Sequence, residues 1–286
     1  MQVSVILCAH NEERRLGEQL DALVSQVTNR EWELVVVDNR STDRTVEIAC
    51  EYASVHPRVR LVAASERADK SYAMSVGVAS SCAELLAFCD GDDIVCPGWI
   101  DAIADGLEVH EVVTGPHELD LLNPRWLADS RGRSVETEAT GTFVGLFPTL
   151  RGANWGVRRT TWDSLGGMRE NCHPVEDLEF SFRCWVLGIQ IVGVPQAVVH
   201  YRYRSTVAEL WRQGYAYGSH RPMVARLVSD EGRARVPRFS GWRSWLLLVA
   251  RFPSVATRQG RASWTWVLAN RVGQVVGSIR YRVVML

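Results

Sequence analysis

Two aspartates separated by one glycine, Asp90-Gly91-Asp92, are the residues of this 286-residue chain whose spacing points most directly to chemistry. They follow the largely apolar run 84–89, which is typical of a buried strand. Two carboxylates at the end of such a strand offer the oxygen ligands that Mg²⁺ or Mn²⁺ prefers. Gly91 would let the backbone approach a ligand closely. Because short acidic patterns are common, the alternative is an acidic turn that caps a helix near Pro97.

Two further polar clusters also follow predicted strands. The segment 9–12 (AHNE) comes after the apolar run 3–8, and Asp38 comes after the run 34–37. Ligands of open parallel sheets bind outside the carboxyl ends of the strands. Asn11 and Asp38 could also be helix caps or turn residues. Three polar clusters at three strand ends nevertheless predict one ligand site.

Strand and helix signals alternate over the first 115 residues. Leu16, Leu20 and Leu23 recur at helical spacing, and the small residues of 71–80 predict another helix before the run 84–89. This order predicts an α/β fold with a Rossmann-like, mostly parallel central sheet flanked by helices.

The rest of the chain is expected to be less regular and then helical. The segment 116–150 is predicted to be rich in loops, and 176–187 is predicted to be a helix. Short strands are expected at 189–194 and 197–203, and helical patterns dominate from about residue 206.

Five segments resemble, in order and spacing, the motifs of family 2 glycosyltransferases of the GT-A fold. They are VSVILCAHNEE, VVVDNRSTDRT, LLAFCDGDD, RGANWGVRR with LGGMRE, and VEDLEFSFRCWVLG. The resemblance covers about residues 1–204 and implies a GT-A catalytic domain there. Its nucleotide-sugar-binding half would be 1–115 and its acceptor-side half 116–204. Residues 205–286 would then be a basic, Trp-rich helical C-terminal extension.

The resemblance implies a donor site at the three strand ends. Asp38 would bind the base, because a carboxylate can accept a hydrogen bond from a ring N–H such as that of uracil. Asp90 would lie near the ribose and the metal, and Asp92 would bind the Mn²⁺ or Mg²⁺ ion that bridges the donor diphosphate. The residues implied to line the nucleotide pocket beside them are Ala9, His10, Glu12 and Gly91.

The resemblance also implies residues for catalysis and for the acceptor. Asp177 would be the catalytic base, and its alternative is an acid that stabilises a helix N-terminus. His200 lies where related enzymes can use a histidine to complete the metal shell, and its alternative is a structural histidine at a strand end. Arg202 and Arg204 either offset diphosphate charge or are solvated. The residues implied on the acceptor side are Asn154, Trp155 and Glu176.

Two departures from the family pattern refine this hypothesis. The family often shows ARNxG where this chain has AMSVG at 73–77, so the usual arginine and asparagine are missing. Lys70 lies just upstream and is a candidate to contact phosphate or base instead. The QxxRW motif of processive enzymes is also missing from the sequence. The prediction is therefore a metal-dependent, inverting glycosyltransferase that adds a single sugar from a nucleotide-diphosphate donor, UDP by default and GDP next. Its acceptor would be a small molecule, a glycan or a lipid-linked sugar.

Other function classes fit the sequence less well. A phosphatase or phosphotransferase normally has its nucleophilic aspartate after the first strand, where this chain has Cys8-Ala9-His10. A nucleotidyltransferase would need a glycine-rich loop at that position. The missing arginine and asparagine keep open a degenerate GT-A domain that acts as a nucleotide-sugar or partner-binding module.

Charge is distributed unevenly along the chain. The net charge of −1 hides an acidic part, 1–200, and a part, 201–286, with fifteen arginines against three acidic residues. Five of the eleven tryptophans are in this basic part. Trp264, Leu268 and Ile279 share one predicted helical face there, with Val272 and Val275. Such a face could bind an anionic membrane, or the extension could pack on the catalytic domain. No nucleic-acid motif accompanies the charge, so no nucleic-acid partner is expected.

Composition and cysteine usage bear on the compartment. The 47% hydrophobic and 23% charged residues are typical of a globular protein. The seven cysteines form no CxxC pair, which favours reduced thiols. The chain opens without the features of a secretory signal, and the apolar run 245–250 is far shorter than a membrane span. We therefore expect a cytoplasmic protein, with peripheral contact at the inner face of the membrane as an open hypothesis.

Overall fold

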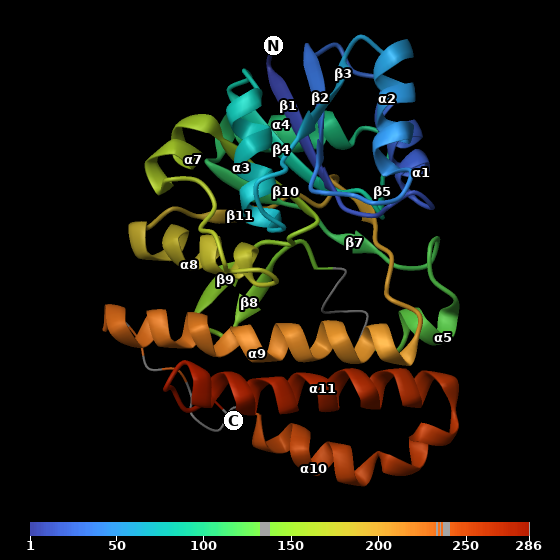
Figure 1. Ribbon diagram of the computed structural model, residues 1–286. Helices are drawn as coiled ribbons and strands as arrows, with labels where there is room; N and C mark the ends of the chain where they lie inside the picture. Colours follow the sequence, from blue (N-terminus) through green and yellow to red (C-terminus); the bar gives the residue numbers. More distant parts are fainter. Residues whose placement is uncertain (132–137, 233, 235, 237–240, 286) are drawn as a thin grey trace. The chain divides into compact units, whose positions relative to one another are not determined.

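The computed structural model describes residues 1–131, 138–232, 234, 236 and 241–285 (Figure 1). The chain divides into two compact units. The first unit holds Met1–Glu118 and Pro148–Arg202, together with a short piece of the middle segment. The second unit holds 142–147 and the chain from Tyr203 onward, together with a stretch that begins at Leu119. The functional division predicted at residue 204 stays a prediction.

A seven-stranded sheet, with strand order β11-β6-β10-β4-β1-β2-β3, forms the centre of the first unit. All of its pairings are parallel except those of β10, which runs antiparallel to β4 and β6. This arrangement confirms the predicted α/β fold with a mostly parallel sheet. The strands are β1 (Val3–Ala9), β2 (Trp32–Asp38), β3 (Val59–Ala63), β4 (Leu85–Asp90), β6 (Val112–Thr114), β10 (Asn154–Arg158) and β11 (Ile191–Gly193).

Helices cover both faces of this sheet. Alternate side chains of each strand point to opposite faces, so each strand contributes to two buried clusters. Val5 and Leu7 of β1 belong to the buried cluster that includes α1 and α4, whereas Ile6 belongs to the cluster that includes α3, α7 and α8. The continuous apolar runs of the sequence therefore reflect strands that are buried on both sides. The helices are α1 (Leu16–Val24), α2 (Thr45–Val55), α3 (Lys70–Ser80), α4 (Trp99–Val109), α7 (Arg159–Leu165) and α8 (Glu176–Leu187).

Two small sheets accompany the central one. Strands β5 (Ile94–Val95), β12 (Val199–His200) and β7 (His117–Glu118) form a three-stranded sheet in that order. Strands β8 (Gly141–Phe143) and β9 (Phe147–Thr149) form a two-stranded sheet where the chain passes between the units.

The second unit is helical, and α9 and α11 lie side by side within it (Figure 1). Helix α9 begins with a capping box between Thr206 and Glu209. A Cβ on Gly218 would lie 2.2 Å from the backbone oxygen of Asn270, so only glycine permits the observed approach of the two helices. The helices are α5 (Arg125–Ala128), α9 (Val207–Glu231), α10 (Trp242–Ala250), a short 3₁₀ helix (Phe252–Ala256) and α11 (Arg258–Arg280).

The fully buried residues of α11 are not the periodic apolar residues of its sequence, most of which are only partly buried. The periodic apolar residues end at Ile279, whose side chain is exposed, whereas small residues such as Ala269 and Gly273 are buried. Close backbone approach, not side-chain size, decides which face of α11 is covered. None of the helices in the described part of the chain combines the length and hydropathy that a bilayer span requires.

Candidate functional site

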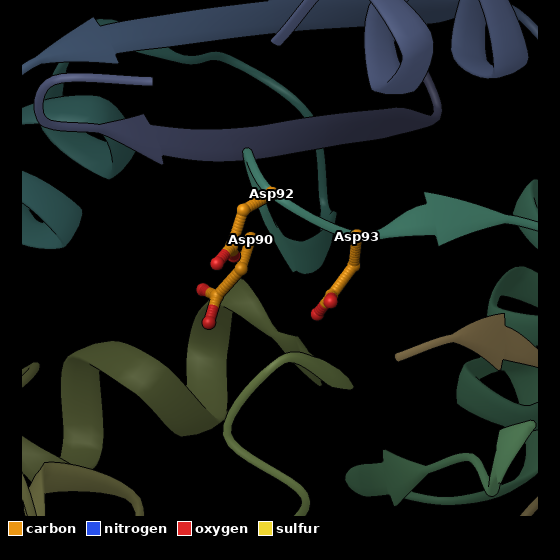
Figure 2. A group of neighbouring side chains, drawn as sticks. All are labelled: Asp90, Asp92 and Asp93. Carbon is orange, nitrogen blue, oxygen red and sulfur yellow. The ribbon is translucent and has the colours of Figure 1, made fainter. Parts of the chain in front are cut away.

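Three carboxylates converge at the carboxyl end of β4 (Figure 2). Oxygen atoms of Asp90, Asp92 and Asp93, the aspartate cluster, all lie within 4.8 Å of one another. Asp93 is 1% exposed, and its Oδ2 has no hydrogen-bond partner among the described residues. The cluster includes the two aspartates singled out from the sequence and adds a third.

The electrostatics of the aspartate cluster fit a cation. Burial raises the pKa of Asp90, the charge of Asp92 adds to this rise, and Lys70 opposes it. Burial likewise raises the pKa of Asp93 well above its usual range, and the charges of Asp92 and Asp90 contribute. A positive ion would relieve this repulsion, and the all-oxygen donor set suits Mg²⁺ or Mn²⁺.

Lys70 connects the aspartate cluster to the beginning of α8. Its Nζ lies 2.6 Å from Oδ1 of Asp90 and 3.9 Å from Oε1 of Glu176. The two acids raise the pKa of Lys70 well above its ordinary value, although burial alone would lower it. Lys70 is the first residue of α3, and Asp69 caps this helix by accepting a hydrogen bond from the backbone N–H of Tyr72. The contact with phosphate or base that the sequence suggests for Lys70 stays a prediction.

Two adjacent acids at the beginning of α8 have different environments. Oε2 of Glu176 lies 3.3 Å from Nδ1 of His173, and the His173 and Lys70 partners lower the pKa of Glu176 although burial alone would raise it. Asp177 accepts a hydrogen bond of 2.8 Å from the backbone N–H of Leu178. Burial, with the charge of Glu176, raises the pKa of Asp177 to about 7. Glu176 is therefore held ionised, whereas Asp177 can take up a proton near neutral pH.

The predicted donor residues lie at the ends of β1 and β2. Nδ1 of His10 is 2.8 Å from the backbone oxygen of Asn39, and the backbone N–H of Glu12 donates to Oγ1 of Thr45. Oδ1 of Asp38 accepts a hydrogen bond of 3.2 Å from the backbone N–H of Ser41. Asp38 thus supports a local turn, which was the alternative considered from the sequence. The nucleotide contacts predicted for Ala9, His10, Glu12 and Asp38 stay predictions.

Comparison with known proteins agrees with this geometry. Residues 4–160, more than half of the chain, match the model of the glycosyl transferase family 2. The chain belongs to glycosyl transferase family 2. Residues 87–277 also match a second model, glycosyl transferase family group 2. The class of the protein is therefore that of enzymes that transfer sugars.

Individual relatives support the family and the GT-A fold. The chain is 33% identical over 233 residues to the putative glycosyltransferase EpsE of Bacillus subtilis, covering 76% of this chain and 77% of EpsE. It resembles the structure of the mannosyltransferase PcManGT from Pyrobaculum calidifontis in complex with GDP-Man and Mn²⁺, with a TM-score of 0.67 and 17% identity over 96% of this chain and 87% of the other. It also resembles S. aureus TarS in complex with UDP-GlcNAc, with a TM-score of 0.62 and 18% identity over 99% of this chain and 93% of the other. The chain spans about half or less of the length of several other curated relatives.

Two residues that the family resemblance placed on the acceptor side lie in the core. Asn154 is fully buried, and its Nδ2 donates to the backbone oxygens of Pro116 and Ala197. Trp155 is also fully buried and stacks on Phe88 with ring centroids 4.2 Å apart. The structure therefore gives both residues an interior, supporting position.

Gly91 packs against the core on the side where other residues carry a Cβ. A Cβ at this position would lie 3.4 Å from Leu7 and 3.5 Å from Leu16, which are ordinary packing distances. The close approach of a ligand to the backbone of Gly91 stays a prediction.

His200 ends β12, which pairs with β5, the strand that follows the aspartate cluster, and Arg202 comes two residues later. The side chains of these two residues have different partners. The ring nitrogens of His200 face Cys96 and Glu118, and His200 is not among the clustered carboxylate ligands. Its metal role stays a prediction. The backbone N–H of Arg202 donates to Oδ1 of Asp93, and its guanidinium bonds to the backbone oxygen of Asp92 and to Glu18. Arg202 therefore holds the loop of the cluster in place.

A buried glutamine that the sequence analysis did not single out holds the same loop. Gln19 of α1 is fully buried. Its Nε2 donates to the backbone oxygen of Asp90, and its Oε1 accepts from the backbone N–H of Val95, both at 2.9 Å. The sequence signal for this role is that Gln19 is a polar residue on the apolar helix face that Leu16 and Leu20 define.

Proposed function

We propose that this chain transfers a single sugar from a nucleotide-diphosphate donor to an acceptor hydroxyl, with inversion at the anomeric carbon and with a divalent metal. The observation that carries this proposal is the position of Lys70 between Asp90 and Glu176. Lys70 thereby links the aspartate cluster, which can bind a cation, to the beginning of α8, where the titratable acid Asp177 lies. Family membership supports the reaction class.

Asp90 and Asp92 would hold the metal, with a further oxygen available from Asp93. When bound, Mn²⁺ or Mg²⁺ supplies positive charge that stabilises the diphosphate leaving group. The complex of PcManGT with GDP-Man and Mn²⁺ supports a divalent ion in a protein of this fold. Gln19 and Arg202 would keep the loop of these aspartates in position through their backbone contacts.

Asp177 would act as the general base. It takes the proton of the acceptor hydroxyl as that oxygen forms a bond to the anomeric carbon, while the bond from this carbon to the phosphate oxygen breaks and its electron pair leaves with the diphosphate. A pKa of about 7 suits this task, because an effective base titrates near the working pH. Glu176, held ionised by Lys70 and His173, would orient the acceptor.

The donor nucleotide would bind at the ends of β1 and β2. Asp38 would accept a hydrogen bond from the base, and the segment 9–12 would line the pocket. Of the two structural neighbours, PcManGT is in complex with GDP-Man and TarS is in complex with UDP-GlcNAc. We propose UDP as the first nucleotide to test and GDP as the second.

A lipid-linked acceptor would bring the chain to a membrane, and α10 offers a surface for this. Leu246 and Val249 of this helix are 60% and 77% exposed. Arg243 of the same helix and Arg251, which follows the helix directly, are exposed as well. Exposed apolar side chains flanked by arginines are typical of helices that lie on an anionic surface.

Thermal unfolding with a panel of UDP- and GDP-sugars, with and without Mn²⁺, tests the donor and the metal together. A donor at 100 times its Kd should add about 2.7 kcal/mol to the free energy of unfolding. We expect one nucleotide class to stabilise the chain, and to do so more strongly with Mn²⁺. Stabilisation by neither class under either condition would contradict the proposal.

A further inference from the structure

The turn formed by residues 151–154 packs against the carboxylate of Asp177. The backbone N–H of Asn154 donates a hydrogen bond of 2.7 Å to the backbone oxygen of Arg151, which closes the turn. Gly152 lies inside it. A Cβ on Gly152 would lie 3.0 Å from Oδ2, 3.3 Å from Cγ and 3.4 Å from Cβ of Asp177, and these atoms are its nearest neighbours beyond residues 151–153. Gly152 therefore contacts the carboxylate so closely that a side chain does not fit without a shift.

The backbone of Gly152 does not itself require a glycine. Gly166 and Gly188, which end α7 and α8, have a positive φ, whereas the φ of Gly152 lies outside the left-handed region. A residue with a side chain can adopt such a backbone conformation. The close approach to Asp177, not the conformation of the turn, is therefore what a larger residue at position 152 would disturb.

Thr114 of β6 holds both ends of the turn. Its Oγ1 accepts a hydrogen bond of 2.9 Å from the backbone N–H of Arg151 and donates one of 2.8 Å to the backbone oxygen of Asn154. Thr114 is fully buried, and breaking these bonds would leave buried polar groups unpaired. The turn therefore cannot yield at low cost to a side chain at position 152.

Ser181 joins the same segment to α8. Its Oγ accepts a hydrogen bond of 3.1 Å from the backbone N–H of Leu150 and donates one of 2.6 Å to the backbone oxygen of Asp177. Oδ1 of Asp177 accepts from the backbone N–H of Leu178, and Oδ2 is the oxygen that lies beside Gly152. Helix α8 thus orients one oxygen of the carboxylate, and the anchored turn sets the position of the other.

We propose that Gly152 is a positioning residue for the proposed sugar transfer: without a side chain at this position, the anchored turn holds the carboxylate of Asp177 where it can take the proton of the acceptor. This inference rests on the proposed role of Asp177 as the general base. A methyl group at position 152 would displace the carboxylate by a few tenths of an ångström. Because a misplacement of about 1 Å can cost about 10²-fold in rate, we expect Gly152→Ala to lower kcat about tenfold.

Urea unfolding of the full chain without ligands tests the contact itself. Gly152→Ala should lower the urea midpoint, because the methyl group and the carboxylate compete for the same space. In the Asp177→Ala background, which has no carboxylate, the same change should leave the midpoint unchanged or raise it. The control Gly17→Ala should lower the midpoint in neither background, since a Cβ there would lie 3.8 Å from Oη of Tyr52. An equal drop of the midpoint in both backgrounds would overturn the proposal.

Turnover separates positioning of the base from mere stability. It is measured as release of UDP or GDP from the nucleotide sugar with water as the acceptor, and the Kd of the donor is measured separately. Gly152→Ala should lower kcat with an unchanged donor Kd. In the Asp177→Asn background it should change kcat less than about twofold, because no base remains to be misplaced. A purely structural role would lower kcat in both backgrounds and would overturn the proposal.

A second variant serves if Gly152→Ala does not fold. Thr114→Val keeps the shape of the side chain but removes both hydrogen bonds of the turn, and it should give the same dependence of kcat on Asp177. An unchanged kcat in the folded variant, where Asp177→Asn lowers kcat, would overturn the positioning role alone. A normal kcat in Asp177→Asn would instead contradict the proposed base itself, and the positioning role with it.

Discussion

At the residue scale, the two acids at the beginning of α8 illustrate how position sets charge. Glu176 and Asp177 are neighbours in the sequence, but among the described residues only Glu176 has cationic partners within ion-pair distance, namely Lys70 and His173. For Asp177, burial and the negative charge of Glu176 raise the pKa to about 7. Two acids whose pKa values are pushed apart can take different roles at the same pH.

The raised pKa of Asp177 predicts a pH-dependent stability. Its folded pKa of about 7 exceeds the ordinary value of about 3.9, so the folded chain retains a proton that the unfolded chain releases between these values. The contribution of Asp177 to stability is therefore lost as the pH rises from about 4 through about 7. Asp177→Asn should raise the free energy of unfolding by about 4 kcal/mol at pH 8, and the gain should shrink towards pH 4. Urea unfolding across this range checks it, and a gain that is constant with pH would argue against the raised pKa.

Asp92 predicts the response to metal. Asp92→Asn keeps the shape of the side chain but removes a charge from the aspartate cluster. We expect the variant to fold, to lose the stabilisation by Mn²⁺ and to lose metal-dependent transfer. Asp163→Asn, which alters an exposed aspartate of α7, is the matched control and should retain both. Undiminished stabilisation by Mn²⁺ in Asp92→Asn would place the ion elsewhere.

At the scale of elements, the sequence predicts the strands and helices that carry a continuous apolar run or a helical period. The apolar runs 3–8 and 34–37 became β1 and β2, and the predicted helix at 176–187 became α8. The short strands β5 and β7 went unpredicted because two residues carry no periodicity and their pairing depends on distant segments, whereas β12 lies within the short strand expected at 197–203.

Within the candidate site, strand-end aspartates were predictable but their supporting contacts were not. Asp90 and Asp92 follow a strand, and parallel strands bring their carboxyl ends to one edge. The contact of Lys70 with Asp90 joins residues far apart in sequence, and no local pattern contains it. The burial of Asn154 likewise follows from its backbone partners, Pro116 and Ala197, on other elements.

The contact between α1 and the loop of the aspartate cluster predicts the effect of Gln19→Met. Methionine fills similar space but leaves the backbone groups of Asp90 and Val95 unpaired in the core. We expect a loss of about 1–3 kcal/mol in the free energy of unfolding and weaker stabilisation by Mn²⁺. Gln259→Met, at an exposed position of α11, should change neither. A Gln19→Met variant with wild-type stability would show that these two bonds do not hold the loop.

At the scale of the whole molecule, charge is divided along the chain. Residues 201–286 carry a surplus of positive charge, and α10 adds exposed apolar side chains. The attraction between this positive charge and an anionic lipid surface would weaken at high ionic strength, because salt screens surface charge.

This division predicts binding to anionic vesicles. The wild-type chain should sediment with phosphatidylglycerol vesicles and much less with phosphatidylcholine vesicles. The pair Leu246→Glu and Val249→Glu should abolish this binding, because it removes apolar contact and adds repulsion. Val55→Glu, at a 70% exposed position of α2, is the control. Equal sedimentation with both vesicle types would leave α10 without a role on membranes.

The central claim is that Asp177 is the base of an inverting sugar transfer, and steady-state kinetics of Asp177→Asn with a separate donor-binding measurement test it most directly. General-base catalysis typically contributes about 10²–10⁴-fold, so kcat should fall by that order. The Kd of the donor nucleotide should stay within a few-fold of wild type, because Asp177 acts on the acceptor. Glu176→Gln should reduce kcat less and raise the KM of the acceptor. Normal turnover at saturation together with lost nucleotide binding in Asp177→Asn would contradict the account.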